Sequence, residues 1–447
     1  MKRKLLVLII ILISLLFLVT LAVFLDGRAA PASAPGPERE SEAETPADAA
    51  ESVSAPLPAP TPFAPLPTPL PQGAARQLEL KIDADGLSPR ALTDGNYYTD
   101  YTFPAGTVIS LEAEEDIAAL YIIFGTYPDE WTLLSGETPQ SCGQDGFLHE
   151  YVSLSEPAAE LQLALSAEHE VMIRDIYAYS DGYLPTSVQT WTRLDERDGA
   201  DILLFSTHYD DELLFFGGLI PYYSTVRGLR VQVVYMTSNY LTDFSNYRFR
   251  PHEALNGLWT AGTHFYPVTN EVPDIECYSY ENAVEHYGED QFTAFQVEQI
   301  RRFKPLVVVT QDENGEYGHG AHILTALSVE RAVAAAADPS QFPESAERYG
   351  VWNTPKTYLH LYGDPDEYTW LNYEIIAPEL GWRSPFQVAQ QAYLQHATQQ
   401  QWVGFYVYSY DHPHDSHRFG LYRSLVGPDA RKNDLMENVS REMFPVQ

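Results

Sequence analysis

The sequence predicts an α/β fold for the C-terminal half of the chain, with a mostly parallel sheet and helices on both faces. An all-β sandwich, a Pro-rich linker and one transmembrane helix are expected before it. From about residue 200 onwards, apolar strands alternate with helical stretches, which is the pattern of βα units. Upstream, short alternating apolar runs are separated by Gly, Pro, Asp and Ser, which is typical of an all-β domain. With 447 residues, the chain is long enough for two folded domains.

Charge and cysteine content exclude several classes of partner and site. The formal net charge is −35, from 62 acidic and 27 basic residues. No basic surplus is available to neutralise phosphates, so we expect no nucleic acid partner and favour a neutral or cationic substrate. The only cysteines are Cys142 and Cys277, which exclude a disulfide framework and a four-cysteine zinc site. A single bridge and two free thiols both remain open.

The N-terminus, residues 1–27, predicts a membrane anchor. Three basic residues at 2–4 precede an uncharged apolar run at 5–25, which as a helix would reach about 31 Å and span a bilayer. The positive-inside rule then places the N-terminus in the cytoplasm and the folded domains outside the cell. A cleaved signal peptide is the alternative, but its apolar region is usually only about 7–15 residues long. The expected location is therefore the cell membrane, in a single pass.

Residues 28–74 are rich in Pro and Ala and predict a disordered, extended linker. Residues 75–195 carry the alternating runs of the expected β-sandwich, at 78–82, 107–113, 119–124, 161–165 and 171–179. Within this region, Leu-Thr-Asp-Gly-Asn-Tyr-Tyr at 92–98 and Arg-Asp-Ile-Tyr-Ala-Tyr at 174–179 resemble the discoidin-type, galactose-binding-like sandwich family. Glycan binding and a purely structural role are both open for this domain.

The α/β half, residues 196–447, predicts four strands whose carboxyl ends meet at one edge of the sheet. The strands are expected at 201–206, 231–236, 305–310 and 357–361, with helices after Asp211, near Pro251, near Gln291 and after His319. In open sheets of this kind, sites form at the carboxyl edge of the strands.

Three further segments lie downstream. An amphipathic helix is expected from 384, and a turn-rich closing segment at 419–429. The histidines at 412, 414 and 417 are interpreted as part of a solvated loop, with a second metal site or a wall of the substrate site as alternatives.

Polar side chains follow the first and third predicted strands of the α/β half, at 201–206 and 305–310. His208, Asp210 and Asp211 come after the first, and His319 and His322 after the third, in a Gly-Glu-Tyr-Gly-His-Gly-Ala-His turn. Two imidazoles and a carboxylate suit zinc, and three protein ligands leave one coordination position open, as in catalytic sites. Other divalent metals accept the same ligand types.

These two blocks resemble the PIG-L or LmbE-like family of N-acetylglucosaminyl deacetylases, zinc enzymes on a Rossmann-like sheet. The family's Ala-His-Pro-Asp-Asp-Glu stands here as Thr-His-Tyr-Asp-Asp-Glu at 207–212, and its Gly-His-Pro-Asp-His as Gly-His-Gly-Ala-His at 318–322. The resemblance assigns roles to seven residues. They are the metal ligands His208, Asp211 and His322, the general base Asp210, the oxyanion-facing groups Tyr317 and His319, and the substrate contact Arg250.

The sequence departs from the family pattern twice. Tyr209 replaces the usual proline between ligand and base. Ala321 replaces the frequent aspartate between the paired histidines, so a carboxylate that orients His319 must come from elsewhere.

The expected function is zinc-dependent hydrolysis of the acetamide of an N-acetylglucosamine-type sugar, in an extracellular or cell-envelope glycan or glycolipid. Two alternatives remain open. One is a surface glycan-binding or adhesion protein whose deacetylase domain is vestigial; the other is an amidase acting on a different N-acyl substrate.

Overall fold

The computed structural model describes residues 73–136, 138–238, 247–400, 406–410 and 412–446. The predicted transmembrane span at 5–25 and nearly all of the linker lie outside these ranges. Within them, no helix is both long and apolar enough to cross a membrane; the longest, α6 (Gly320–Ala335), has 16 residues, short of the roughly 20 that a span requires. On this finding we correct the prediction of a single-pass membrane protein with extracellular domains: the described residues contain no membrane-spanning helix.

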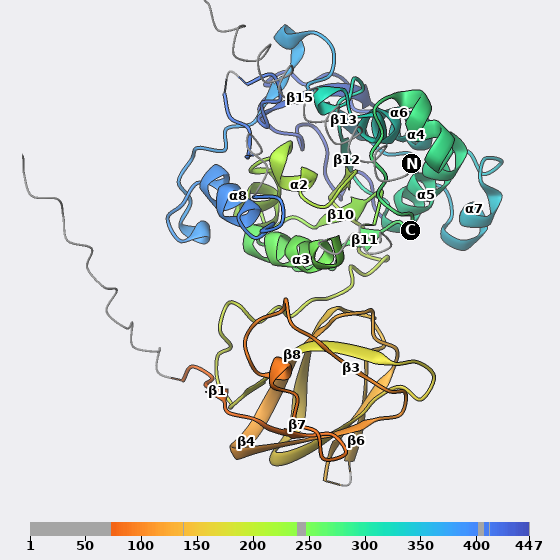
Figure 1. Ribbon diagram of the computed structural model, residues 1–447. Helices are drawn as coiled ribbons and strands as arrows, with labels where there is room; N and C mark the ends of the chain where they lie inside the picture. The colour runs from red at the N-terminus through yellow and green to blue at the C-terminus, as the bar shows by residue number, and fades with distance from the viewer. Residues whose placement is uncertain (1–72, 137, 239–246, 401–405, 411, 447) are drawn as a thin grey trace, which may run out of the picture. The chain divides into compact units, whose positions relative to one another are not determined.

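The α/β half contains a seven-stranded, mostly parallel sheet, as predicted (Figure 1). Its strands, in spatial order, are β11 (Val268–Thr269), β10 (Val231–Tyr235), β9 (Ile202–Ser206), β12 (Val307–Thr310), β13 (Lys356–His360), β15 (Arg418–Ser424) and β14 (Thr369–Trp370). The first five run parallel to one another, whereas β15 is antiparallel to both β13 and β14. The closing segment predicted as turns at 419–429 is therefore largely strand β15.

Helices cover both faces of this sheet, because both faces of its central strands are apolar. In β9, Ile202 and Leu204 belong to one buried core, and Leu203 and Phe205 to the other. Helices α2 (Asp211–Leu214), α3 (Arg250–Ala261) and α8 (Pro385–Tyr393) contribute to the first core. Helices α4 (Tyr280–Tyr287), α5 (Glu289–Phe303) and α6 contribute to the second, on the other side of the sheet (Figure 1).

Shorter helical segments complete this half. They are α7 (Pro343–Tyr349), the π-helical η2 (Pro221–Val226), and the 3₁₀ turns η4 (Tyr247–Phe249), η5 (Glu316–Gly318), η6 (Pro365–Glu367) and η7 (Pro378–Leu380). The predicted helix from 384 is α8, which begins with a capping box between Ser384 and Gln387.

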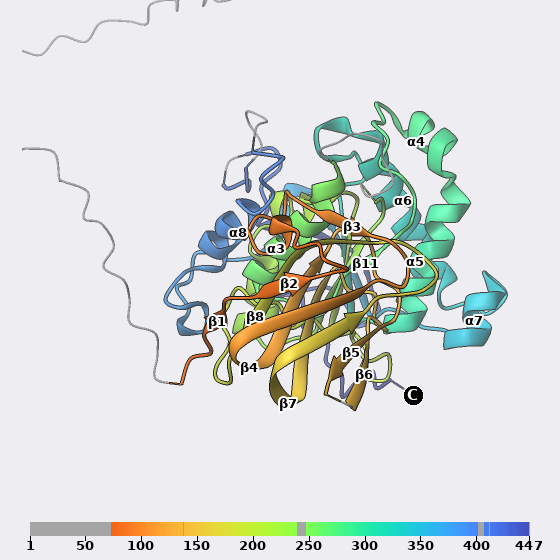
Figure 2. The same cartoon turned by 60° about the horizontal axis from the view of Figure 1, so that its bottom comes forward.

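The upstream region is all β, as predicted, apart from the short η1 (Arg90–Leu92). Its strands are β1 (Gln77–Leu78), β2 (Lys81–Asp83), β3 (Tyr101–Phe103), β4 (Val108–Phe124), β5 (Trp131–Ser135), β6 (Thr138–Cys142), β7 (His149–Ala164) and β8 (Val171–Tyr179). The runs expected separately at 107–113 and 119–124 are one long strand, β4, whose pairing with β7 is irregular between Glu112 and Ala119 (Figure 2). All eight strands thus join one antiparallel sheet, with a large apolar core and a second, smaller cluster of buried residues. Glycan binding by this region stays a prediction.

A buried row of polar side chains connects the β region to α3, within the single compact unit Pro69–Gln447. Arg174 Nε donates to His252 Nε2 at 3.1 Å. His252 Nδ1 lies 2.9 Å from His149 Nε2, and His149 Nδ1 lies 2.8 Å from Gln189 Oε1.

The two cysteines, Cys142 and Cys277, are free buried thiols, which settles the question of a disulfide bridge between them.

Candidate metal and catalytic site

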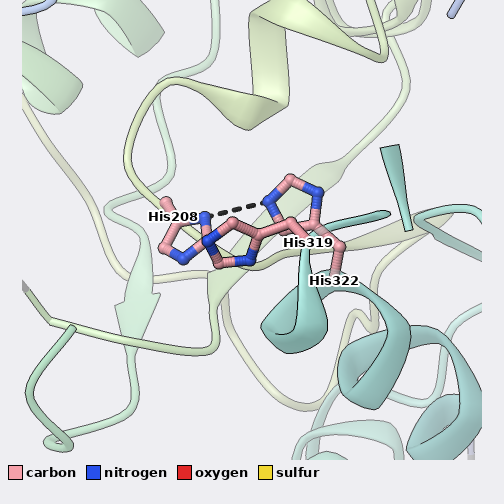
Figure 3. A group of neighbouring side chains, drawn as sticks. All are labelled: His208, His319 and His322. Atoms are coloured by element: carbon pink, nitrogen blue, oxygen red, sulfur yellow. Dashed lines mark hydrogen bonds between the residues drawn. The ribbon is translucent and has the colours of Figure 1, made fainter. Parts of the chain in front are cut away.

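Three predicted ligand atoms converge where β9 and β12 end. His322 Nε2 lies 3.0 Å from His208 Nδ1 and 3.1 Å from Asp211 Oδ2. His208 Nδ1 lies 3.0 Å from the same carboxylate oxygen. Figure 3 shows a ring nitrogen of His208 and one of His322 pointing toward each other, with His319 beside them. All three histidines offer nitrogen atoms within 4.8 Å of one another.

This atom set fits a metal ion. Tetrahedral coordination with bonds of about 2.1 Å separates ligands by about 3.4 Å, close to the distances of 3.0 to 3.1 Å found here. Two imidazole nitrogens and one carboxylate oxygen are also a common donor set for divalent transition metals. Burial opposes charge on Asp211, but His322 and His208 hold the pKa of its carboxyl well below the usual range. The site therefore presents an anionic ligand between two imidazoles.

Backbone and amide contacts fix the loop that carries the first two ligands. The backbone N–H of His208 donates to Asp211 Oδ2 at 2.8 Å. Gln311, which follows β12, donates from Nε2 to the same oxygen at 3.2 Å and accepts from the Thr207 N–H at 3.1 Å. These hydrogen bonds connect the ends of the adjacent strands β9 and β12 next to the ligands.

Asp210, the predicted base, is buried and strained. Its φ of 115° is a conformation that a residue with a side chain rarely adopts, and such strain persists at functional sites when the surroundings enforce it. The enforcing contacts are the Asp210 N–H donating to Glu212 Oε2 at 2.8 Å and Arg250 donating to Asp210 Oδ1 at 3.0 Å. Burial raises the pKa of Asp210 to about 7, although Arg250 opposes this shift. Glu212 is itself fully buried and contacts His396.

Arg250 is placed beside the base, where it also donates to the Tyr209 carbonyl. The guanidinium is almost fully buried, and a second carboxylate, Asp274, lies 3.8 Å from it. Substrate contact by Arg250 stays a prediction, because what the structure displays is its hold on the loop of Asp210.

Tyr317 and His319 also lie close to the ligand His322. The Tyr317 ring centroid lies 5.5 Å from that of His322 and 5.8 Å from that of His319. Tyr317 has a positive φ of 50° and is half exposed. His319 caps the start of α6, and burial together with His322 and His208 lowers its pKa to about 2, so its ring is neutral. Ala321 is buried in the second core.

Sequence reasoning missed two carboxylates that hold the ligand rings. Asp274 Oδ1 lies 3.3 Å from His208 Nε2. Glu316 Oε2 lies 2.8 Å from His322 Nδ1, and its other oxygen lies 2.8 Å from His360 Nδ1. Glu316 was visible in the turn before His319, whereas Asp274 belongs to a loop without a recognisable motif.

Rings of Tyr408 and His414 pack against Phe215, which lies beside the ligand His322. Phe215 lies with its ring centroid 5.6 Å from that of His322 and 5.6 Å from that of Tyr408. His414 Nε2 accepts the Tyr317 backbone N–H at 3.2 Å, and His417 is fully buried. The interpretation as a solvated loop is therefore wrong for His417, whereas His412 and His414 are partly exposed.

Comparison with known proteins supports the resemblance. The family model described as GlcNAc-PI de-N-acetylase, PIG-L, matches residues 203–333. The deacetylase of 1D-myo-inositol 2-acetamido-2-deoxy-alpha-D-glucopyranoside from Geodermatophilus obscurus is 45% identical over 69 residues, covering 15% of this chain and 22% of that protein. The mycothiol S-conjugate amidase of Streptomyces coelicolor is 43% identical over 65 residues, covering 14% and 22%.

A solved structure of N,N'-diacetylchitobiose deacetylase from Pyrococcus horikoshii aligns at 22% identity with a TM-score of 0.33, over 46% of this chain and 72% of that one. The chain spans less than a quarter of the length of the curated relatives described above. Those relatives are named as a deacetylase and an amidase, which both hydrolyse amide bonds. Residues 203–333, which hold every candidate site residue predicted from the sequence, therefore form a domain of the PIG-L de-N-acetylase family.

Proposed function

We propose that this chain is a zinc-dependent de-N-acetylase that hydrolyses the acetamide of an N-acetylglucosamine-type sugar. The observation that carries the proposal is the convergence of His208 Nδ1, His322 Nε2 and Asp211 Oδ2 within 3.0 to 3.1 Å of one another. These three atoms form the metal triangle. Asp210, the residue next to Asp211 in the chain, has a carboxylate that is not part of this triangle. The PIG-L match and the acetamido sugar in the name of the Geodermatophilus relative support the substrate class.

The chemistry follows from the roles that these side chains can take. A divalent metal held by the triangle would lower the pKa of a water molecule towards about 7 and polarise the acyl oxygen. Asp210 would accept the proton of the attacking water, and the same proton could then pass to the departing amine nitrogen. Arg250 keeps the Asp210 carboxylate in place through its contact at 3.0 Å.

Tyr317 and His319 would stabilise the charge that develops on the acyl oxygen. Both rings lie within 6 Å of the His322 ring, measured between centroids (5.5 Å and 4.7 Å). A phenol and a neutral imidazole can each donate one hydrogen bond, and a preorganised donor of this type is worth about 3–4 kcal/mol in the transition state.

The decisive variant is Asp210→Asn in the full chain. We expect it to abolish acetate release from N-acetylglucosamine conjugates while zinc stays bound, because the metal triangle is intact. Asp181→Asn, at an exposed position, is the matched control and should behave like wild type. Acetate release retained by Asp210→Asn would remove this residue from the mechanism.

Two measurements separate the proposal from its alternatives. Wild-type protein that binds no stoichiometric divalent metal, and stays inert when zinc is added, would favour a binding protein with a vestigial site. Release of a longer acyl group in preference to acetate, in a panel of N-acyl sugars, would favour the amidase reading that the name of the Streptomyces relative suggests.

A further inference from the structure

Glu316 lies between two buried imidazoles and contacts both. Its side-chain oxygens each lie 2.8 Å from a ring Nδ1, one of His322 and the other of His360. All three side chains are fully shielded from solvent. They come from different elements: Glu316 opens η5, His322 lies in the first turn of α6, and His360 ends β13.

The contact fixes which nitrogen of His322 carries the proton. An ionised carboxylate only accepts hydrogen bonds, so His322 Nδ1 must donate to Glu316. The lone pair of the neutral ring is then on Nε2, the atom 3.0 Å from His208 Nδ1 and 3.1 Å from Asp211 Oδ2. Glu316 therefore selects the tautomer of His322 that can bind a metal, and aims the ring at the site.

His360 holds Glu316 from the opposite side. Its Nδ1 lies 2.8 Å from Glu316, and its Nε2 lies 3.1 Å from the carbonyl oxygen of Asp415. The backbone N–H of Asp312 adds a third donor to Glu316 at 3.2 Å. A buried carboxylate with these three hydrogen-bond partners is held in one orientation.

This arrangement differs from the one expected from the family pattern at Ala321. That position offers no carboxylate, since the alanine is packed in an apolar core. Glu316 supplies a carboxylate from five residues earlier, and it orients His322 rather than His319.

We propose that Glu316 is a positioning residue that sets the metal affinity of the site by fixing the tautomer and direction of His322, with His360 as its support. The proposal rests on the proposed function only in taking His322 as a metal ligand. Carboxylates that accept from a ligand histidine typically contribute about 10–100-fold in metal affinity.

Zinc affinity of the full chain tests this directly, measured by competition with a chromophoric chelator after metal removal. Glu316→Gln should bind zinc about 10–100-fold more weakly than wild type, because an amide can also present a donor to Nδ1 and no longer selects the tautomer. Glu316→Asp keeps the charge but is one methylene shorter, and it should lose a smaller part of the affinity. Glu313→Gln, in the same loop and only partly buried, is the matched control and should match wild type.

A second readout is the visible absorption of the cobalt-loaded protein. It should shift in Glu316→Gln, because the geometry around the metal changes, and it needs no catalytic activity. Zinc affinities of Glu316→Gln and Glu316→Asp within twofold of the control would overturn the proposal. If Glu316→Gln fails to fold, the comparison of Glu316→Asp with Glu313→Gln decides alone. Wild-type protein that binds zinc without releasing acetate would contradict the proposed function and leave this test intact.

Discussion

Arg250 contacts the candidate base, and this contact gives a prediction that separates two roles. Arg250→Gln removes the cation 3.0 Å from Asp210 Oδ1 and frees the Tyr209 carbonyl. We expect kcat to fall about 100-fold through misplacement of the base, with KM and zinc content little changed. Steady-state kinetics with metal analysis check this. A raised KM at unchanged kcat would instead establish the direct substrate contact that the sequence predicted.

Tyr317 gives a second prediction for a single side chain. Tyr317→Phe removes the hydroxyl proposed to face the developing oxyanion, and it should lower kcat about 100- to 1,000-fold without affecting zinc binding. The control is Tyr183→Phe, at a position that is 81% exposed. Equal kcat values for both variants would remove Tyr317 from catalysis.

At the residue scale, the sequence predicted which side chains meet but not what holds them. His208 and Asp211 follow one strand, and His322 follows its neighbour, so parallel pairing brings them together. The carboxylates of Asp274 and Glu316 were missed because a single acidic residue in a loop carries no periodic signal. Only the folded chain shows that each lies against a ligand ring.

At the scale of elements, the start of α6 gives a further prediction. A Cβ at Gly320 would collide with the backbone carbonyl of Ser279, and the Gly320 N–H donates to Cys277 O at 2.9 Å. Gly320→Ala should therefore displace the first turn of α6, which carries His322, at a cost of about 1–3 kcal/mol in unfolding free energy.

Urea unfolding and zinc affinity together measure this displacement. Gly228→Ala is the comparison, because a Cβ there meets open space among the described residues and the cost comes from its φ of +61° alone. Unchanged zinc affinity in Gly320→Ala would show that α6 tolerates the shift.

Elements with a strong local pattern were predicted, and those defined by long-range pairing were not. The buried strands β9, β10, β12 and β13 were expected within two residues of their observed limits, and the first three of them are almost continuous apolar runs. Strand β15 was missed, since Gly420 and the Gly-Pro pair at 427–428 read as turns. Its order depends on pairing with β13, some 60 residues earlier in the chain.

At the scale of the whole molecule, the buried side chains of His149 and His252 predict how the unfolding free energy changes with pH. Burial lowers the pKa of His149 to about 4 and that of His252 well below its usual range. Between pH 6.5 and 4 the unfolded chain binds a proton at His149 that the folded chain does not, so unfolding free energy must fall as the pH falls. His149 alone should account for a loss of about 2 kcal/mol at pH 5 relative to pH 7.

Urea unfolding of the metal-free protein at pH 7 and pH 5 measures this loss. His149→Gln cannot be protonated, so its stability should change less over the same interval. An equal change in wild type and variant would show that His149 does not set the acid stability of the contact between β7 and α3.

The proposed function makes the chain a metal-dependent de-N-acetylase whose metal lies between His208, Asp211 and His322. The most direct test is acetate release from N-acetylglucosamine conjugates by protein stripped of metal and then restored with one equivalent of zinc. We predict no release by the stripped protein, recovery on addition of zinc, and no recovery in His322→Ala. Equal acetate release before and after stripping, or full recovery in His322→Ala, would contradict the claim.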